Sequence, residues 1–180
     1  MRFQNRLHLP KIEVMKHITR YLVILCCLLP LTLYAAPKVS KKRQKLIDYA
    51  LTLRGSPYSY AGKTPSGFDC SGYVIYTFKQ ALNIKLPASS QAIYDKVTII
   101  EEKEREPGDL MFFKTTSSGK ISHVGIYLGM YRGEGKFKDK RIFIHAASDG
   151  PETGVIISAI DEKYWKNHFA GWGRVLPKSK

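Results

Sequence analysis

The stretch Gly67-Phe68-Asp69-Cys70-Ser71-Gly72 places a cysteine where a glycine-rich loop runs into an amphipathic segment. Apolar residues after Cys70 recur at helical spacing and predict a helix over residues 71–82 with one buried face. Cys70 would then lie at the N-terminus of this helix, where free backbone N–H groups and the helix dipole favour a reactive thiolate. The alternative is that Cys70 is a small buried apolar residue. The apolar residues are Val74, Phe78, Ala81 and Leu82.

The composition is that of one ordinary globular domain with a strong positive charge. The chain has 180 residues, 44% of them hydrophobic, and a formal net charge of +14. This charge favours an anionic partner such as nucleic acid, a membrane surface or a bacterial wall polymer. The basic residues are scattered, their densest runs are Lys41-Lys42-Arg43 and Lys136 to Arg141, and no nucleic-acid recognition motif accompanies them. We therefore expect solvated basic faces and no nucleic-acid partner.

The N-terminal segment has the layout of a secretory signal peptide. An apolar run from Tyr21 to Tyr34 follows basic residues and precedes Ala35-Ala36. The run contains Pro30 and is shorter than the roughly 20 apolar residues that span a bilayer. We expect residues 1–36 to be a signal peptide, with translation possible from Met15, and residues 37–180 to form a single exported domain, periplasmic or secreted.

Export would leave one cysteine in the mature chain. Cys26 and Cys27 lie inside the apolar run, and Cys26 follows Ile24-Leu25, whereas a lipoprotein signal has small residues at that place. Simple cleavage is therefore favoured over lipidation, which would tether the domain to a membrane. A lone thiol in an oxidising compartment needs a use or deep burial, and this strengthens the case for Cys70 as a nucleophile.

The mature chain is predicted to be an α+β domain, with N-terminal helices packed on a mostly antiparallel sheet. A basic polar segment, Lys38 to Lys45, precedes a first helix whose apolar stripe is Leu46, Ile47, Ala50, Leu51 and Leu53, and a short helix runs from Pro87 through Tyr94. Residues 101–106 are expected to form a solvated connection. The predicted strands are Asp109 to Phe113, Ile121 to Leu128, Arg141 to Ala146, Val155 to Ile160 and Trp172 to Leu176.

Two strand histidines are candidate bases for the thiol. Alternation along 121–128 sets His123, Gly125 and Tyr127 on one face and aliphatic residues on the other. This predicts that His123 points toward the side where the helix of Cys70 packs. If the strands are adjacent, His145 could accept a hydrogen bond from His123 and fix its tautomer. Two alternatives remain: half-buried histidines without a task, or a zinc site built from Cys70, His123 and His145.

These residues belong to a series of motifs that resembles the NlpC/P60 family of bacterial cell-wall peptidases, and the series occurs in the family's order between about Lys45 and Leu176. The ending, from Tyr164-Trp165-Lys166 to Gly173-Arg174-Val175-Leu176, is most similar to the small periplasmic murein endopeptidases. The other motifs are Pro57-Tyr58-Ser59-Tyr60-Ala61-Gly62, Gly67 to Gly72, Pro107-Gly108-Asp109-Leu110-Met111-Phe112-Phe113, Ser122-His123-Val124-Gly125-Ile126-Tyr127 and Phe143-Ile144-His145-Ala146.

The resemblance implies a papain-like fold and hydrolysis of amide bonds in peptidoglycan stem peptides or cross-links. It implies that Cys70 is the nucleophile, His123 the base and His145 the residue that orients His123. Tyr58 would help polarise the scissile carbonyl together with the Cys70 backbone N–H. Asp69 and Ser71 match residues that bind the stem peptide in some relatives. The implied binding partner is peptidoglycan. We also expect the protein to be a monomer that needs no cofactor and no metal ion.

The sequence departs from the family pattern at two places. Ala61 stands where many members have glycine, which we expect to be a mild change. The segment from Met130 to Arg141 is longer and more basic than in compact members, and we expect a solvated loop rather than an extended hairpin. Two rival functions stay open: a non-catalytic wall-binding module with the same fold, and a papain-like acyltransferase or amidase acting on another substrate.

Overall fold

The structure, a computed structural model, describes residues 39–179. The expected signal peptide, the Met15 start, the two N-terminal cysteines and the cleavage site lie outside these residues. In the part that is described, no helix combines the length and apolar character needed to cross a membrane.

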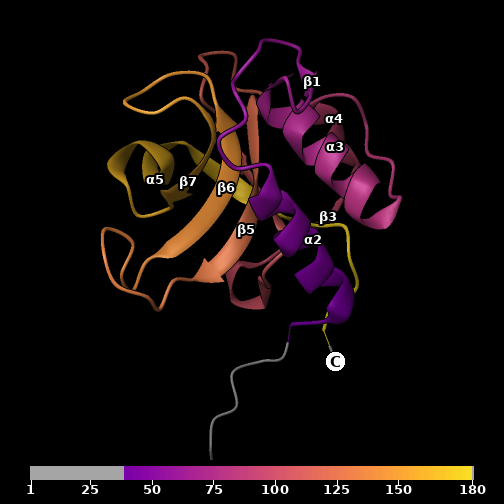
Figure 1. Cartoon of the computed structure of the whole chain (residues 1–180), viewed down its shortest axis with the longest axis vertical. Helices are drawn as coiled ribbons and strands as arrows, with labels where there is room; N and C mark the ends of the chain where they lie inside the picture. The colour runs from indigo at the N-terminus through magenta and orange to yellow at the C-terminus, as the bar shows by residue number, and fades with distance from the viewer. Residues whose placement is uncertain (1–38, 180) are drawn as a thin grey trace, which may run out of the picture. The chain divides into compact units, whose positions relative to one another are not determined.

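The domain is an α+β fold, as predicted (Figure 1). Among the described residues, all helices but a short one near the C-terminus lie in the N-terminal half of the domain, and most strands lie in its C-terminal half. The helices are α2 (Lys41–Thr52), α3 (Cys70–Leu82), α4 (Ser90–Lys96) and α5 (Lys163–His168), with a 3-10 turn η1 (Glu102–Glu104). The strands are β1 (Lys63–Thr64), β2 (Gly67–Phe68), β3 (Thr98–Ile100), β4 (Leu110–Phe113), β5 (His123–Met130), β6 (Arg141–Ala147), β7 (Gly154–Ala159) and β8 (Phe169–Arg174).

Helix α2 begins earlier than the apolar pattern predicts. The side chain of Ser40 caps the helix by accepting a hydrogen bond from the N–H of Arg43, so the expected polar lead-in forms the first helical turn. Arg43 is fully buried, whereas Leu51, assigned to the apolar stripe, is 40% exposed. The prediction of a solvated basic run was therefore wrong for Arg43, whose charge is neutralised by partners far away in the sequence.

Helix α3 confirms the prediction made from its apolar spacing. Asp69 is its N-cap, and its C-cap Asn83 has a left-handed backbone with φ of 57°. Val74 and Phe78 on its inner face are fully buried. This packing fixes the direction of the helix and thereby the position of Cys70, its first residue.

The main sheet has six strands in the order β3-β8-β4-β5-β6-β7. Every neighbouring pair is antiparallel, and all five predicted strands are present with shifted ends. Strand β3 at the edge of the sheet, helix α5 and the separate two-stranded sheet of β1 and β2 were not predicted. The segment between β5 and β6 is a mostly exposed loop, as predicted.

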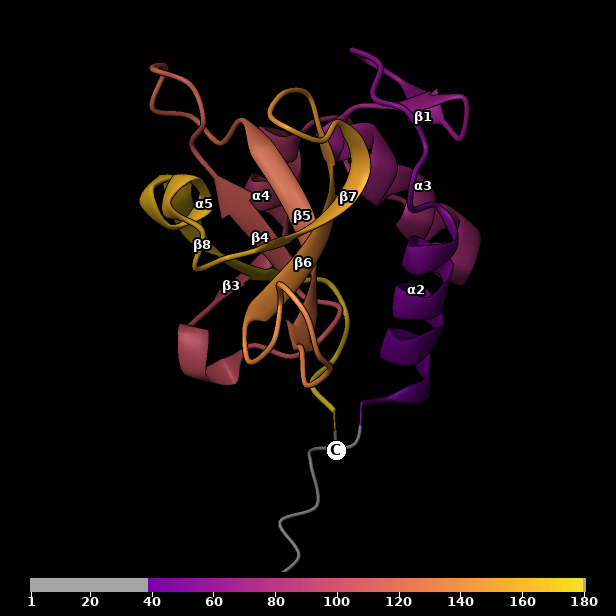
Figure 2. The same ribbon diagram turned by 60° about the vertical axis from the view of Figure 1, so that its left-hand side comes forward.

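Both faces of the sheet are covered, and this corrects the predicted side of His123. Val124 and Ile126 belong to the core that contains the inner face of α3. His123 instead packs on the ring of Phe113, which belongs to a second, aromatic core. Figure 2 shows α2 and α3 on one side of the sheet and α5 on the other. The aliphatic face receives the helices because branched side chains pack closely against them, so His123 lies on the opposite face.

A buried cluster of charges ties the ends of the domain together. Arg43 Nη1 lies 2.8 Å from Asp109 Oδ1, and Arg174 Nη2 lies 2.7 Å from Asp109 Oδ2. Arg43 Nε also pairs with Glu106 at 3.0 Å, and Nη1 donates to the carbonyl of Pro107 at 2.9 Å. We call Arg43, Glu106, Asp109 and Arg174 the charge cluster; it joins α2 to the beginning of β4 and the end of β8.

Candidate active site

Cys70 lies where the N-terminus of α3 meets the beginning of β5. Its side chain is half-buried, and its Sγ donates to the carbonyl oxygen of Ser122 at 3.7 Å. The backbone N–H of Val124 also lies close enough to interact with the sulfur. The thiol therefore contacts the backbone of the residues on both sides of His123. The N-terminus of α3 brings Cys70 to this strand, although α3 packs on one face of the sheet and the His123 side chain lies on the other.

The two predicted histidines form a chain of hydrogen bonds across three strands. His123 Nε2 lies 2.9 Å from His145 Nδ1, and His145 Nε2 lies 3.0 Å from Ser158 Oγ. His145 is fully buried, and His123 and Ser158 are 8% and 5% exposed. We call these three residues the histidine chain. Because the Nε2 atom of His123 is occupied by His145, only its Nδ1 is left to exchange a proton with another group.

Aromatic side chains enclose the histidine chain. The Trp165 ring lies 5.0 Å from that of His123 and 4.7 Å from that of His145, and Phe143 stacks on His145 at 4.7 Å. Gly125 leaves the room that the second histidine needs, since a Cβ there would lie 3.1 Å from His145 Cβ and 2.7 Å from Phe143 Cδ2. The enclosure keeps water away from both rings and limits their orientations.

Burial keeps the thiol and the imidazoles uncharged. Burial and, to a smaller extent, the Asp69 carboxylate raise the pKa of the Cys70 thiol to about 11, although nearby backbone N–H groups act to lower it. Burial lowers the pKa of His123 to about 3 and holds the pKa of His145 well below its usual value. The backbone N–H groups at the start of α3 lower the pKa of the thiol, as expected, but desolvation and the Asp69 charge outweigh them, so the net shift is upward.

The loop that carries Tyr58 is held by backbone hydrogen bonds to Phe68, two residues before Cys70. The N–H of Phe68 donates to Pro57 O, and the N–H of Ser59 donates to Phe68 O, both at 3.0 Å. Burial and the nearby Cys70 and Asp69 raise the pKa of the Tyr58 hydroxyl. Tyr58 thus lies within electrostatic range of the thiol.

Asp69 and Ser71 bond to each other as part of the helix cap. Asp69 Oδ1 accepts from the N–H of Gly72 at 2.6 Å and from the Ser71 hydroxyl at 2.8 Å. Asp69 is half-buried and Ser71 is 9% exposed. Both side chains therefore have a structural role in the cap at the start of α3.

The departure at Ala61 has a larger structural consequence than expected. Its φ is 56°, in the left-handed region, where a Cβ costs about 1 kcal/mol. The neighbouring Gly62 has no such freedom, because a Cβ there would lie 2.3 Å from Gly67 O. The loop keeps its shape despite the alanine because hydrogen bonds from Asp69 to Gly62 and from Gly62 to Ser59 hold it.

The zinc arrangement considered for Cys70, His123 and His145 is not formed. The facing nitrogens of the two histidines bond to each other, so they do not converge on a common point with the sulfur. Within residues 39–179 there is no group of three or more His, Cys, Asp or Glu side chains placed to hold a metal ion.

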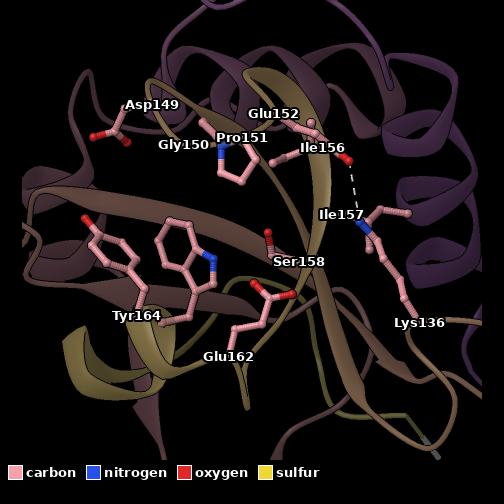
Figure 3. Close-up of a pocket in the computed structure, with 12 residues that line it drawn as sticks. Lys136, Asp149, Gly150, Pro151, Glu152, Ile156, Ile157, Ser158, Glu162 and Tyr164 are labelled. Carbon is pink, nitrogen blue, oxygen red and sulfur yellow. Dashed lines mark ion pairs between the residues drawn. The ribbon is translucent and has the colours of Figure 1, made fainter.

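A cavity of about 410 Å³ lies behind the histidine chain, between β7, α5 and the loop after β6 (Figure 3). Ser158 and Trp165 line it, and so do Asp149 and Tyr164. Asp149 lies near enough to Tyr58 and to Tyr164 to raise the pKa of both hydroxyls. The loop that carries Asp149 therefore borders both the cavity and the tyrosine beside the thiol.

Sequence reasoning missed Ser158 and gave Trp165 no role in the site. Ser158 lies in a predicted strand, but its pairing with His145 depends on the register of β6 and β7, in which Phe143 lies opposite Ser158. Trp165 occupies a six-residue helix too short for a periodic signal. The occurrence of a serine among the apolar residues of β7 was the one visible sign.

Comparisons with known proteins find relatives that are named as endopeptidases. The chain is 35% identical over 148 residues to "Murein DD-endopeptidase MepH" of Escherichia coli K12, covering 79% of this chain and 49% of that protein. It is 36% identical over 124 residues to "Probable endopeptidase NlpC" of the same organism, covering 69% of this chain and 72% of that protein. The chain thus spans about half the length of MepH.

A solved structure and a family model identify the family of this chain. An NLP/P60 family protein similar to lipoprotein, from Staphylococcus aureus, superimposes with a TM-score of 0.61 at 32% identity, over 81% of this chain and 45% of that one. The model of the NlpC/P60 family matches residues 55–174, which include Cys70, both histidines and Trp165. The chain belongs to the NlpC/P60 family.

Proposed function

We propose that this chain is an exported cysteine endopeptidase that hydrolyses amide bonds in peptidoglycan stem peptides or cross-links. The observation that carries the proposal is the meeting of the Cys70 thiol with the strand segment that holds His123 and its hydrogen-bonded partner His145. The names of MepH and NlpC as endopeptidases support it. The strongly basic chain suits an anionic wall polymer.

In this mechanism Cys70 attacks the scissile carbonyl carbon while His123 Nδ1 takes the thiol proton. The Cys70 N–H and the Tyr58 hydroxyl stabilise the negative charge on the carbonyl oxygen by donating hydrogen bonds to it. The intermediate then collapses to a thioester, and His123 returns its proton to the leaving amine. Water, deprotonated by His123, hydrolyses the thioester and restores the thiol.

The uncharged resting state implies that proton transfer accompanies attack. A thiol whose pKa is raised to about 11 and an imidazole whose pKa is lowered to about 3 do not form an ion pair before substrate arrives. A bound substrate with a developing oxyanion would favour the positive imidazole, which links activation of the thiol to binding.

Asp69 and Ser71 are assigned to substrate contact by family position. Both hydrogen bonds of the cap are accepted by Oδ1 of Asp69, and neither uses the second carboxylate oxygen. This second oxygen can accept a backbone N–H of a stem peptide without undoing the helix terminus. Asp69→Asn would keep the capping oxygen and remove the charge, so it separates these two roles.

The proposal is tested with purified sacculi and mass analysis of the released muropeptides. Cys70→Ala and His123→Ala should each abolish release while the variants stay folded by circular dichroism. His168→Ala is the matched histidine control, because His168 bonds to the carbonyl of Tyr164 and lies outside the histidine chain. Wild-type release by Cys70→Ala would overturn the proposal. The masses of the products identify the bond that is cut.

The same experiment distinguishes the rival functions. A non-catalytic wall-binding module would bind sacculi equally with Cys70→Ala and would release nothing, with or without iodoacetamide. An amidase or acyltransferase acting elsewhere would leave sacculi intact but would turn over another acyl substrate with the same thiol.

Export is a separate part of the proposal. The apolar run at residues 21–34 and the alanines after it support cleavage near Ala36. N-terminal sequencing of the exported protein should find its first residue close to Pro37. Incorporation of a palmitate analogue would instead show lipidation, and a full-length exported chain would contradict cleavage.

A further inference from the structure

Ser158 closes the histidine chain at the end away from the thiol. Its hydroxyl is the only side-chain partner that the structure, within residues 39–179, gives to His145 Nε2, at 3.0 Å. Both groups are buried, so an unpaired N–H there would cost about 1–3 kcal/mol. The state of this one hydrogen bond therefore affects the whole chain.

The two possible directions of the chain have opposite chemical consequences. If Ser158 accepts from His145 Nε2–H, then His145 Nδ1 must accept from His123 Nε2–H, and His123 Nδ1 is a free base. If Ser158 donates instead, His145 Nδ1–H donates to His123 Nε2, and the proton of His123 lies on Nδ1. Only the first direction lets His123 take a proton from Cys70.

The surroundings of Ser158 favour the first direction. Its side chain borders the cavity of about 410 Å³, between Ile157 and Glu162 on its lining (Figure 3). A hydroxyl that accepts from His145 can turn its own proton into this cavity, toward water or another acceptor. A hydroxyl that donates to His145 has no proton left to donate to a group in the cavity.

We propose that Ser158 is a positioning residue that holds the histidine chain in the direction that leaves His123 Nδ1 unprotonated. The inference rests on the proposed function, in which His123 is the base for Cys70. It adds Ser158, contributed by β7, to the series Cys70, His123 and His145 from α3, β5 and β6. The same arrangement supports the positive imidazole during catalysis, since each donor in the chain then faces an acceptor.

The test compares Ser158→Ala, Ser158→Thr and wild type on soluble muropeptides. Ser158→Ala should lower kcat at least about tenfold with little change in KM, because the base is affected and the substrate contacts are not. Ser158→Thr keeps the hydroxyl and should recover most of kcat. Thr77→Val, which removes another buried hydroxyl that bonds to the Tyr73 carbonyl, is the matched control and should keep wild-type kcat.

A second measurement does not depend on activity. Long-range proton–nitrogen NMR of the imidazole rings reads the tautomers directly, and wild type should show the Nε2–H form for both His123 and His145. Ser158→Ala should shift both rings toward the Nδ1–H form, and Ser158→Thr should restore them. Unchanged tautomers and kcat in Ser158→Ala would overturn the inference.

The two readouts separate failure of this inference from failure of the proposed function. If Cys70 is not a peptidase nucleophile, muropeptides stay uncut but the tautomers still respond to Ser158→Ala. If the protein is a peptidase and the inference is wrong, wild type cuts muropeptides and Ser158→Ala changes neither kcat nor tautomers.

Discussion

The charge cluster, which lies at the end of the sheet beside α2, and the histidine chain, which lies within the sheet, bury polar side chains by opposite means. In the charge cluster, Asp109 faces two arginines at 2.7 and 2.8 Å, and backbone carbonyls take further guanidinium donors. In the histidine chain, neutral rings and a hydroxyl satisfy one another, and no opposite charge is among their hydrogen-bond partners in the described residues. The first arrangement stabilises charges permanently, whereas the second leaves a base that can gain and lose a proton.

The difference shows which buried side chains of this fold can change their protonation state. A buried ion pair that loses one partner leaves the other uncompensated, so the charge cluster serves stability. A buried neutral imidazole is poorly stabilised as a cation at rest, so its protonation can be linked to events at the thiol. The predictions below compare the two regions, beginning with the largest expected effect.

Removing a charge from the charge cluster should cost the most stability. Arg43→Met keeps much of the apolar volume but leaves Asp109 and Glu106 with one cation fewer. We expect the free energy of unfolding in urea to fall by about 3–5 kcal/mol. Lys103→Met, which breaks an exposed pair with Glu101, is the control and should change it by less than about 1 kcal/mol. Equal losses of unfolding free energy in the two variants would contradict a special contribution of the charge cluster to stability.

Acid should weaken the protein through the histidine chain. The folded-state pKa of each histidine lies below the unfolded value of about 6.5, so the unfolded chain binds more protons as pH falls through that value. The stability contributed by the neutral rings is complete above pH 6.5 and decreases below it. Between pH 7 and 5 we expect a loss of about 2 kcal/mol from His123, and a further loss from His145 in the same direction.

Urea unfolding of wild type and His145→Gln over this pH range checks the assignment. The variant has one titrating ring fewer, so its stability should fall less steeply with acid. Parallel curves for the two proteins would mean that the acid sensitivity arises from other groups.

Filling the space beside the histidines should cost less stability but also affect activity. A Cβ in Gly125→Ala would lie 2.7 Å from Phe143 Cδ2 and 3.1 Å from His145 Cβ. We expect a loss of about 1–3 kcal/mol and a lower kcat, because His145 must move away from His123. Gly119→Ala, in an open loop position with φ of 70°, tests backbone strain alone and should leave kcat unchanged. A fully active Gly125→Ala would show that the spacing of the two rings is not critical.

The smallest expected effect concerns the charge of the helix cap. Asp69→Asn keeps an oxygen for the Gly72 N–H but removes the carboxylate that raises the pKa of Cys70. Alkylation of the thiol by iodoacetamide at pH 8 should become severalfold faster, because a larger fraction is thiolate. The measurement is a rate by mass spectrometry, with Asp48→Asn on α2 as the control. A slower reaction in Asp69→Asn would contradict the assigned effect of the carboxylate.

Much of the fold was predictable because the signals are local. The apolar spacing of α3 and the alternating strands after Pro107 depend on neighbours in sequence, and these elements are present. Helix α5 and β3 are too short for such patterns, and the buried state of Arg43 depends on Asp109, 66 residues away. Long-range pairing of charges leaves no periodic trace, so a run of basic residues was interpreted as solvated.

The sequence by itself determined the α+β class, the order of the family's motifs and the candidates Cys70, His123 and His145, because each is marked by residue type and by its immediate neighbours. Tyr58 was a candidate only through the resemblance to the family. Only the tertiary structure decided that His123 lies on the aromatic face, that the end of α3 brings the thiol to β5, and that Ser158 completes the chain. Strand register and the covering of both sheet faces decide these points. Desolvation, which depends on every surrounding side chain, decided that the thiol and the imidazoles rest uncharged.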